Sequence, residues 1–168
     1  MFSNFEKVLQ FHKKFDLPRP YSPQMPFVGM RHIDQVTAIM LIAQAENHIK
    51  NARTSNDVAW GRIQMMLEEL REYADAVLRG DLATQADSLV DLEYFALGTA
   101  VTSGFPHDEI FDEVHRANME KERVANADES VRLNKLDVKK PEGWQPPDVE
   151  GALERRRSTA RALKQVLA

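Results

Sequence analysis

The stretch that decides the fold is residues 61–100, GRIQMMLEELREYADAVLRGDLATQADSLVDLEYFALGTA. Apolar residues recur with a period near 3.6 on both sides of RGD (79–81), which predicts two helices joined by a tight break. We expect the first to run from about Asn56 to Leu78 and the second over residues 84–103. Helices joined by so short a loop pack antiparallel. This hairpin is the centre of the predicted fold.

Most of the remaining chain shows the same helical period, so we expect an all-α protein, a helical bundle that forms dimers. Ser3 and Glu6 are spaced as a capping box for a first helix over residues 3–15. Four prolines in residues 16–26 predict an extended linker after it. Further helices are expected over 34–52 and over HDEIFDEVHRANMEKERVA, residues 107–125.

The length of 168 residues suits one domain. We expect a single helical domain over 1–168, with core helices at about 31–124, an irregular tail at 125–151 and a basic C-terminal helix at 152–168. Gly104 and Pro106 are the expected terminators between the fourth and fifth helices.

The composition limits which metal ligands and which kinds of partner the chain can have. There is no cysteine, so a metal would be held by oxygen or imidazole ligands. A formal net charge of −4 without a long basic tract gives no footprint for polymeric nucleic acid. No apolar run approaches the roughly 18 residues needed to span a bilayer, and the N-terminus lacks a signal-peptide pattern. We therefore expect a cytoplasmic protein with no membrane partner.

The first helix of the hairpin carries a stripe of glutamates at positions 68, 69 and 72. They lie away from its predicted core face, which consists of Ile63, Met66, Leu67, Leu70, Ala74 and Val77. Solvated helix faces usually mix basic residues among their glutamates, and this stripe has none. For this helix alone, a plain solvated face remains an open interpretation.

The second helix adds two more carboxylates. Asp87 and Asp91 are four residues apart and share one stripe with Tyr94 and Gly98, whereas Glu93 points away. Because the rest of this helix is almost all apolar or small, we expect it to be buried on most sides, and its carboxylates then need partners. Facing the stripe at 68–72, they would form the ligand set that Mg²⁺ requires, with Mn²⁺ as the alternative ion.

With these motifs in order, the chain resembles the all-α nucleoside triphosphate pyrophosphohydrolases, the MazG-like and phosphoribosyl-ATP pyrophosphohydrolase-like superfamily. The resemblance covers most of residues 5–149. It rests on Glu-Glu-x-x-Glu at 68–72 and on four segments: DLEYFALGTA (91–100), EVHRANMEK (113–121), KKPEGWQPPD (139–148) and FHKKFDLPRP (11–20). The downstream segments are similar to the branch that contains dUTP-hydrolysing housecleaning enzymes.

One position departs from the family pattern. The second acidic motif is commonly Glu-x-x-Asp, but the residue three before Asp91 is Ser88, with Asp87 one position earlier. Either Asp87 swings into the same groove or a water replaces the missing ligand.

The resemblance implies metal-dependent cleavage of a nucleoside or deoxynucleoside triphosphate between its α and β phosphates, which gives the monophosphate and pyrophosphate. The implied metal ligands are Glu68, Glu69, Glu72 and Asp91, with Asp87 as the additional candidate. The three glutamates are also the catalytic candidates, since a carboxylate that is free of the metal can orient or deprotonate the attacking water.

Four residues are candidates for substrate binding. The resemblance implies that Asn118 and Lys121 contact the sugar or phosphates, with a solvent-facing helix end as an equal alternative. Lys139 and Lys140 precede the rigid loop PEGWQPP and deliver positive charge to the triphosphate, unless they are an ordinary surface pair. We expect Trp144 in that loop to anchor the tail to the core, with stacking on a base as the alternative.

Two other classes of protein compete with the enzyme. A non-catalytic helical interaction module derived from this fold is suggested by Ser88 and by the basic tail. A di-iron carboxylate bundle would need paired Glu-x-x-His motifs, and only residues 112–115 approach that pattern. For either the enzyme or the module we expect a homodimer or homotetramer, because apolar helices in a chain of this length leave surplus surface to bury.

Overall fold

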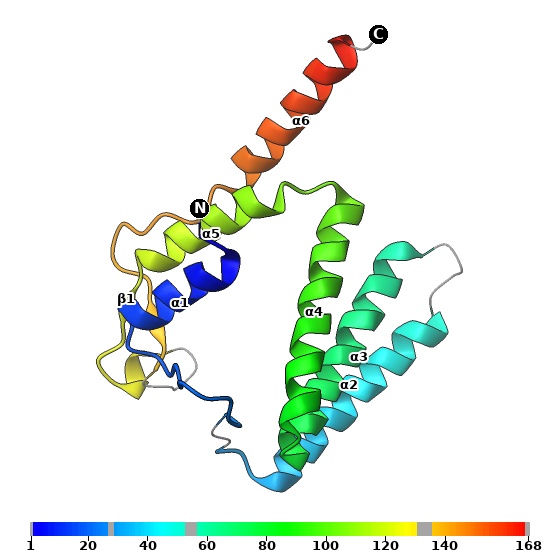
Figure 1. The fold of residues 1–168 in the computed structure, drawn as a ribbon, viewed down its shortest axis with the longest axis vertical. Coiled ribbons are helices and arrows are strands. Elements are labelled where there is room, and N and C mark those ends of the chain that lie inside the picture. Colours follow the sequence, from blue (N-terminus) through cyan, green and yellow to red (C-terminus); the bar gives the residue numbers. More distant parts are fainter. Residues whose placement is uncertain (1, 27–28, 53–56, 131–135, 167–168) are drawn as a thin grey trace. The chain divides into compact units, whose positions relative to one another are not determined.

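The computed structural model describes residues 2–26, 29–52, 57–130 and 136–166 (Figure 1). The chain divides into two compact units, which are described separately. One unit is Pro20–Ser103, and the other combines Met1–Arg19 with Gly104–Ala168. Both are built from helices, which confirms the all-α prediction.

The unit Pro20–Ser103 contains three long helices, α2 (His32–Ala52), α3 (Val58–Arg79) and α4 (Leu82–Ser103). Helix α3 packs against both α2 and α4. The Asp57 side chain caps α3 by accepting from the Trp60 backbone N–H at 3.1 Å. Gly80 ends α3 in the left-handed conformation at φ 71°, which costs glycine little because it has no Cβ. The predicted hairpin is confirmed.

The other unit contains α1 (Asn4–Lys14), α5 (His107–Met119) and α6 (Val149–Val166), together with the short strands β1 (Glu122–Arg123) and β2 (Val138–Lys139) and a 3₁₀ turn over Ala127–Glu129. The strands pair antiparallel, with Glu122 opposite Lys139. Helix α1 packs on α5, and α5 on α6. The predicted capping box of Ser3 and Glu6 is present at the start of α1.

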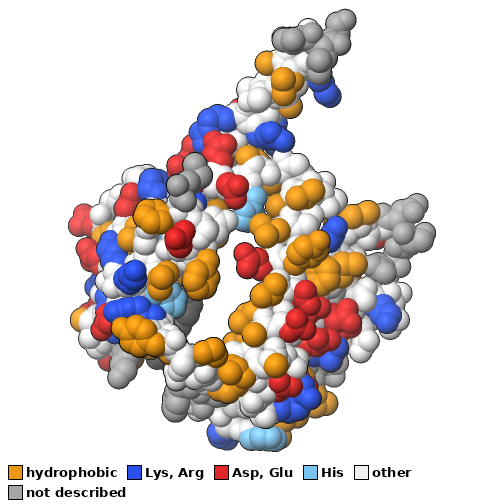
Figure 2. Space-filling view, viewed as in Figure 1, with side chains coloured by type: hydrophobic (Ala, Val, Ile, Leu, Met, Phe, Trp, Pro, Cys, Tyr) orange, Lys and Arg blue, Asp and Glu red, His pale blue; other side chains and the backbone are white. Residues whose placement is uncertain are grey.

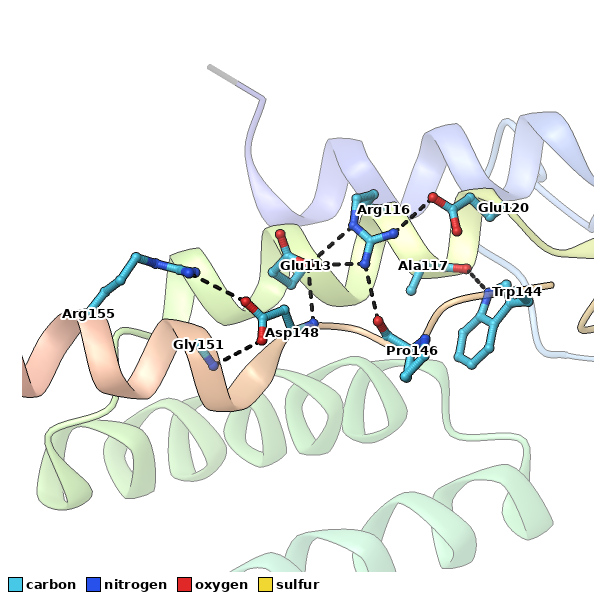
Figure 3. A network of polar contacts seen from close by, with 9 residues as sticks. All are labelled: Glu113, Arg116, Ala117, Glu120, Trp144, Pro146, Asp148, Gly151 and Arg155. Atoms are coloured by element: carbon cyan, nitrogen blue, oxygen red, sulfur yellow. Dashed lines mark hydrogen bonds and ion pairs between the residues drawn. The ribbon is translucent and has the colours of Figure 1, made fainter.

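The tail before α6 is tied to α5 by hydrogen bonds and ion pairs (Figure 3). The Trp144 Nε1–H donates to the Ala117 carbonyl at 2.7 Å, which confirms the predicted anchor. Arg116 donates to the Pro146 carbonyl at 3.2 Å, and Glu113 accepts from the Asp148 backbone N–H at 3.2 Å. These bonds fix the point at which α6 begins.

Two predicted boundaries are wrong. The fifth helix ends at Met119 instead of continuing to about residue 125, and the basic terminal helix begins at Val149 instead of residue 152. The first difference arises because Glu122 and Arg123 pair with β2, and the Arg123 guanidinium donates to the Phe15 carbonyl at 2.8 Å. Both sets of contacts are long-range, so a helical periodicity does not contain them.

The expectation that the fourth helix is buried on most sides is also wrong for this chain alone. Val90, Tyr94 and Val101 are 64%, 71% and 80% exposed, and Leu89 is half-exposed. Their positions on α4 lie outside the side covered by α3. The face of α3 that was predicted to be core is incompletely covered as well, because Ile63 and Leu70 remain about one-third exposed.

Within the described ranges, no helix is both long enough and apolar enough to cross a bilayer.

Candidate active site

The glutamates of α3 lie at its border with α4. Glu68, Glu69 and Glu72 are each partly buried, while Asp87 and Asp91 on α4 are exposed. Figure 2 shows acidic side chains gathered over α3 and α4, with hydrophobic side chains beside them along α4. The five predicted carboxylates therefore belong to one helix pair.

Glu69 lies at the centre of the electrostatic interactions among these carboxylates. Burial raises the pKa of the Glu69 carboxyl above its ordinary value, and the negative charges of four neighbours raise it further. In order of decreasing effect, the neighbours are Glu72, Asp91, Glu68 and Asp87. The structure thus brings all five predicted residues into one electrostatic group centred on Glu69.

The group is not a closed ligand cage. In the part of the chain that the structure describes, no three acidic or histidine side chains converge closely enough to hold a metal ion. The chemistry of the donors nevertheless fits a hard divalent cation, because five carboxylates offer oxygen ligands whose mutual repulsion such a cation relieves.

Ser88 lies on the buried side of α4. It is 2% exposed, and among the described residues its Oγ has no hydrogen-bond partner; the same holds for Oε1 of the buried Gln85, one turn earlier. Ser88 takes the place of the glutamate in the Glu-x-x-Asp motif, so a carboxylate at this position would enter the helix interface. The two aspartates that this chain retains are at the exposed edge of α4.

Arg71 is held away from the carboxylate stripe. Its Nε donates to Glu46 Oε2 on α2 at 3.0 Å, and Glu46 is buried. This hydrogen bond is the main reason that the pKa of Arg71 is raised, and the charges of Glu72 and Glu68 contribute further. The pair joins α2 to α3 without neutralising the stripe directly.

The four predicted substrate-binding residues lie in the other unit. Asn118 is in the last turn of α5, and its carbonyl accepts from the Lys121 backbone N–H at 3.2 Å. Lys139 forms an ion pair with Glu129 at 2.6 Å. The Lys140 ammonium sits 4.4 Å from the centre of the Trp144 ring. Both lysines therefore have partners within their own unit, and their role in binding stays a prediction.

Sequence reasoning missed one basic residue of the hairpin, Arg62. It is seven residues before Glu69, so both project from the same side of α3. Its guanidinium lies against Gly98, which is likewise seven residues after Asp91 on α4. The matching spacing on the two helices was a signal available in the sequence.

Residues 37–118 match the family model for phosphoribosyl-ATP pyrophosphohydrolase. A crystal structure of a candidate NTP pyrophosphohydrolase from Exiguobacterium sp. 255-15 is similar to this chain with a TM-score of 0.56 and 23% identity, covering 95% of this chain and 98% of that one. This chain has the all-α NTP pyrophosphohydrolase fold. The resemblance seen in the sequence is confirmed, while no curated protein matches.

The matched region of this all-α NTP pyrophosphohydrolase fold starts within α2 and ends within α5. It contains the five carboxylates, Arg62 and Asn118, whereas Lys121, Lys139 and Lys140 lie beyond it. The match to the family model is therefore centred on the α3 and α4 pair.

Proposed function

We propose that this protein is a metal-dependent nucleotide pyrophosphohydrolase that cleaves a nucleoside or deoxynucleoside triphosphate to the monophosphate and pyrophosphate. The observation that carries the proposal is the carboxylate group around Glu69, whose pKa is raised by burial and by four acidic neighbours. Unneutralised carboxylates at a helix interface are unfavourable for folding, so their concentration is better explained by binding of a cation.

Mg²⁺, or Mn²⁺ in its place, would be held by Glu68, Glu69, Glu72 and Asp91, with Asp87 as a further ligand. The bound metal would neutralise phosphate charge and lower the pKa of a coordinated water. The chain's own part is to present the ligands from two packed helices, which keeps their backbones in place. A carboxylate of the group that is not bound to metal would accept a proton from the attacking water.

The test is magnesium-dependent release of pyrophosphate, measured with the purified chain over a panel of ribonucleoside and deoxynucleoside triphosphates. We expect release with at least one nucleotide and its loss on chelation of the metal. Recovery of phosphate instead of pyrophosphate would contradict cleavage between the α and β phosphates.

The second candidate function is a non-catalytic interaction module, and Ser88 is the observation that favours it. A buried hydroxyl replaces an acidic ligand position of the family, so one metal ligand is lost unless Asp87 compensates. A protein that releases no pyrophosphate from any nucleotide and shows no magnesium-induced rise in melting temperature would support the module over the enzyme.

We further propose that the protein forms a homodimer or homotetramer through the exposed side of α4. Val90, Tyr94 and Val101 recur there at helical spacing, and large apolar side chains left uncovered together mark an interaction surface. Light scattering coupled to size-exclusion chromatography measures the mass directly. A purely monomeric wild type at micromolar concentration would contradict this proposal, and Val101→Glu should shift an oligomer towards monomer.

A further inference from the structure

We propose that Arg62 binds the terminal phosphates of the nucleotide and so orients the triphosphate along the α3 and α4 pair. This inference rests on the proposed function, because it assigns the leaving-group end of the same substrate. It adds a binding residue that the sequence motifs do not contain.

Arg62 lies on the same side of α3 as the carboxylate group. Arg62 and Glu69 are two turns apart on α3, about 10 Å along the helix axis, and point to the same side within about 20°. On α4, Asp91 and Gly98 have the same separation. The side of the helix pair that carries these residues thus has the carboxylates at one level and the guanidinium about two turns away.

Within the described residues, Arg62 differs from the other arginines of α3 because it has no carboxylate partner. Of the arginines on α3, Arg71 pairs with Glu46 at 3.0 Å and Arg79 with Asp75 at 3.0 Å. In the described residues, Arg62 has no acidic side chain within ion-pair distance; its recorded hydrogen bond runs from Nη2 to the neutral Thr102 Oγ1 at 3.4 Å. Most of its five N–H donors therefore remain available to an anion.

The Arg62 guanidinium packs against α4 at Gly98 and Thr102. A Cβ at Gly98 would lie 3.0 Å from Arg62 Nη1, so the glycine leaves the space that the guanidinium occupies. Thr102 Oγ1 donates to the Gly98 carbonyl at 2.8 Å, which orients its lone pairs towards Arg62. The guanidinium therefore already lies against α4 before any ligand arrives, so less side-chain entropy is lost on binding than for a freely rotating arginine.

Phosphate is the ligand that these features select. A planar guanidinium matches a phosphate group with two parallel hydrogen bonds, and its charge persists at every relevant pH. Carboxylates without a bound metal repel a polyphosphate. The metal is therefore needed near the bond that is cleaved, and a second positive charge is needed near the terminal phosphates. Arg62 is placed to supply the second charge.

The experiment measures binding of inorganic pyrophosphate to the full-length protein by calorimetry in the presence of Mg²⁺. Arg62→Gln should weaken pyrophosphate binding by roughly tenfold or more, since a charge-assisted pair is lost. Arg62→Lys should recover only part of the affinity because it cannot form the two-pronged contact. Arg79→Gln, on the same helix, is the matched control and should bind as wild type does.

Gly98→Ala provides a second variant that cannot fail by losing the helix, since alanine favours helix formation more than glycine does. The added methyl group would lie 3.0 Å from Arg62 Nη1, so the guanidinium must shift by a few tenths of an ångström, which should weaken pyrophosphate binding while the charge of Arg62 is kept. Unchanged affinity in both Arg62→Gln and Gly98→Ala would overturn the inference and show that Arg62 only braces α3 against α4.

The outcomes also separate this inference from the proposed function. A wild type that hydrolyses nucleotides, with an Arg62→Gln variant that keeps the wild-type KM, refutes the role of Arg62 and leaves the enzyme intact. A wild type that hydrolyses nothing, but binds pyrophosphate in a manner that depends on Arg62, refutes the enzyme and supports the phosphate site.

Discussion

The two polar regions of this molecule differ in whether their carboxylates form ion pairs with basic side chains. Where the tail meets α5, carboxylates have partners: Glu113 pairs with Arg116 at 3.1 Å, and Asp148 with Arg155 at 3.4 Å (Figure 3). Between α3 and α4, five carboxylates interact mainly with one another, and none forms an ion pair within the described residues. Carboxylates that stabilise the fold form ion pairs with basic side chains of the protein. A group of carboxylates without such pairs indicates that a cation from solution binds there.

The largest effect is expected from removing charge at the centre of the carboxylate group between α3 and α4. Glu69→Gln and Glu72→Gln should each lower nucleotide hydrolysis about 100-fold or more, because each removes a metal ligand or a base, while circular dichroism remains that of a helical protein. Initial rates of pyrophosphate release at saturating Mg²⁺ measure this. Asp75→Asn, on the same helix but paired with Arg79, is the control. Full activity in both glutamine variants would refute the metal site.

The next effect concerns the metal itself. Mg²⁺ at millimolar concentration should raise the melting temperature of the wild type by several degrees, because it binds the folded state preferentially. Asp91→Asn should show a smaller rise, since a ligand from α4 is lost. Glu93→Gln, also on α4, is exposed and outside the group, so it should keep the full rise. Equal shifts in wild type and Asp91→Asn would show that Asp91 does not hold the metal.

Mutations in the ion-paired region, where the tail meets α5, should change the stability of the protein but not its metal binding. Glu113→Gln removes the charge that pairs with Arg116 and weakens the hydrogen bond from the Asp148 backbone N–H, so the free energy of unfolding should fall by about 1 kcal/mol. Chemical denaturation measures the loss. The magnesium-induced rise in melting temperature should be unchanged; a reduced rise would break the distinction between the two regions.

The smallest effect is a pH dependence of the metal-free protein. The pKa of Glu69 is raised in the folded state, so its carboxylate destabilises the fold once pH exceeds the unfolded value, and the penalty is complete above the folded pKa. Metal-free Glu69→Gln should therefore be more stable than wild type at pH 7, by less than about 1 kcal/mol because solvent screens a partly exposed group. Near pH 3.5 the two should converge. A difference that is constant with pH would contradict the assigned cause.

Much of the candidate site was predictable because helical periodicity alone determines which side chains share a face. The spacing of Glu68, Glu69 and Glu72, and of Asp87 and Asp91, defined both stripes before the helices were placed. In the folded chain the negative charges of both stripes raise the pKa of Glu69, so the stripes lie close enough to interact. The burial of Ser88 was not predictable, since it depends on how α4 is rotated against α3.

Local sequence by itself determined the capping box at Ser3, the end of α3 at Gly80 and the hairpin that follows. These features depend on hydrogen bonds and backbone angles among residues a few positions apart. Tertiary structure alone decided that the fifth helix ends at Met119, that α4 is left exposed along one side and that Arg62 lies over Gly98. Each of these depends on contacts between distant residues, whose geometry is set by the packing of whole helices. The spacing of residues along one helix shows which side chains share a side, but it does not show which side of the next helix they meet.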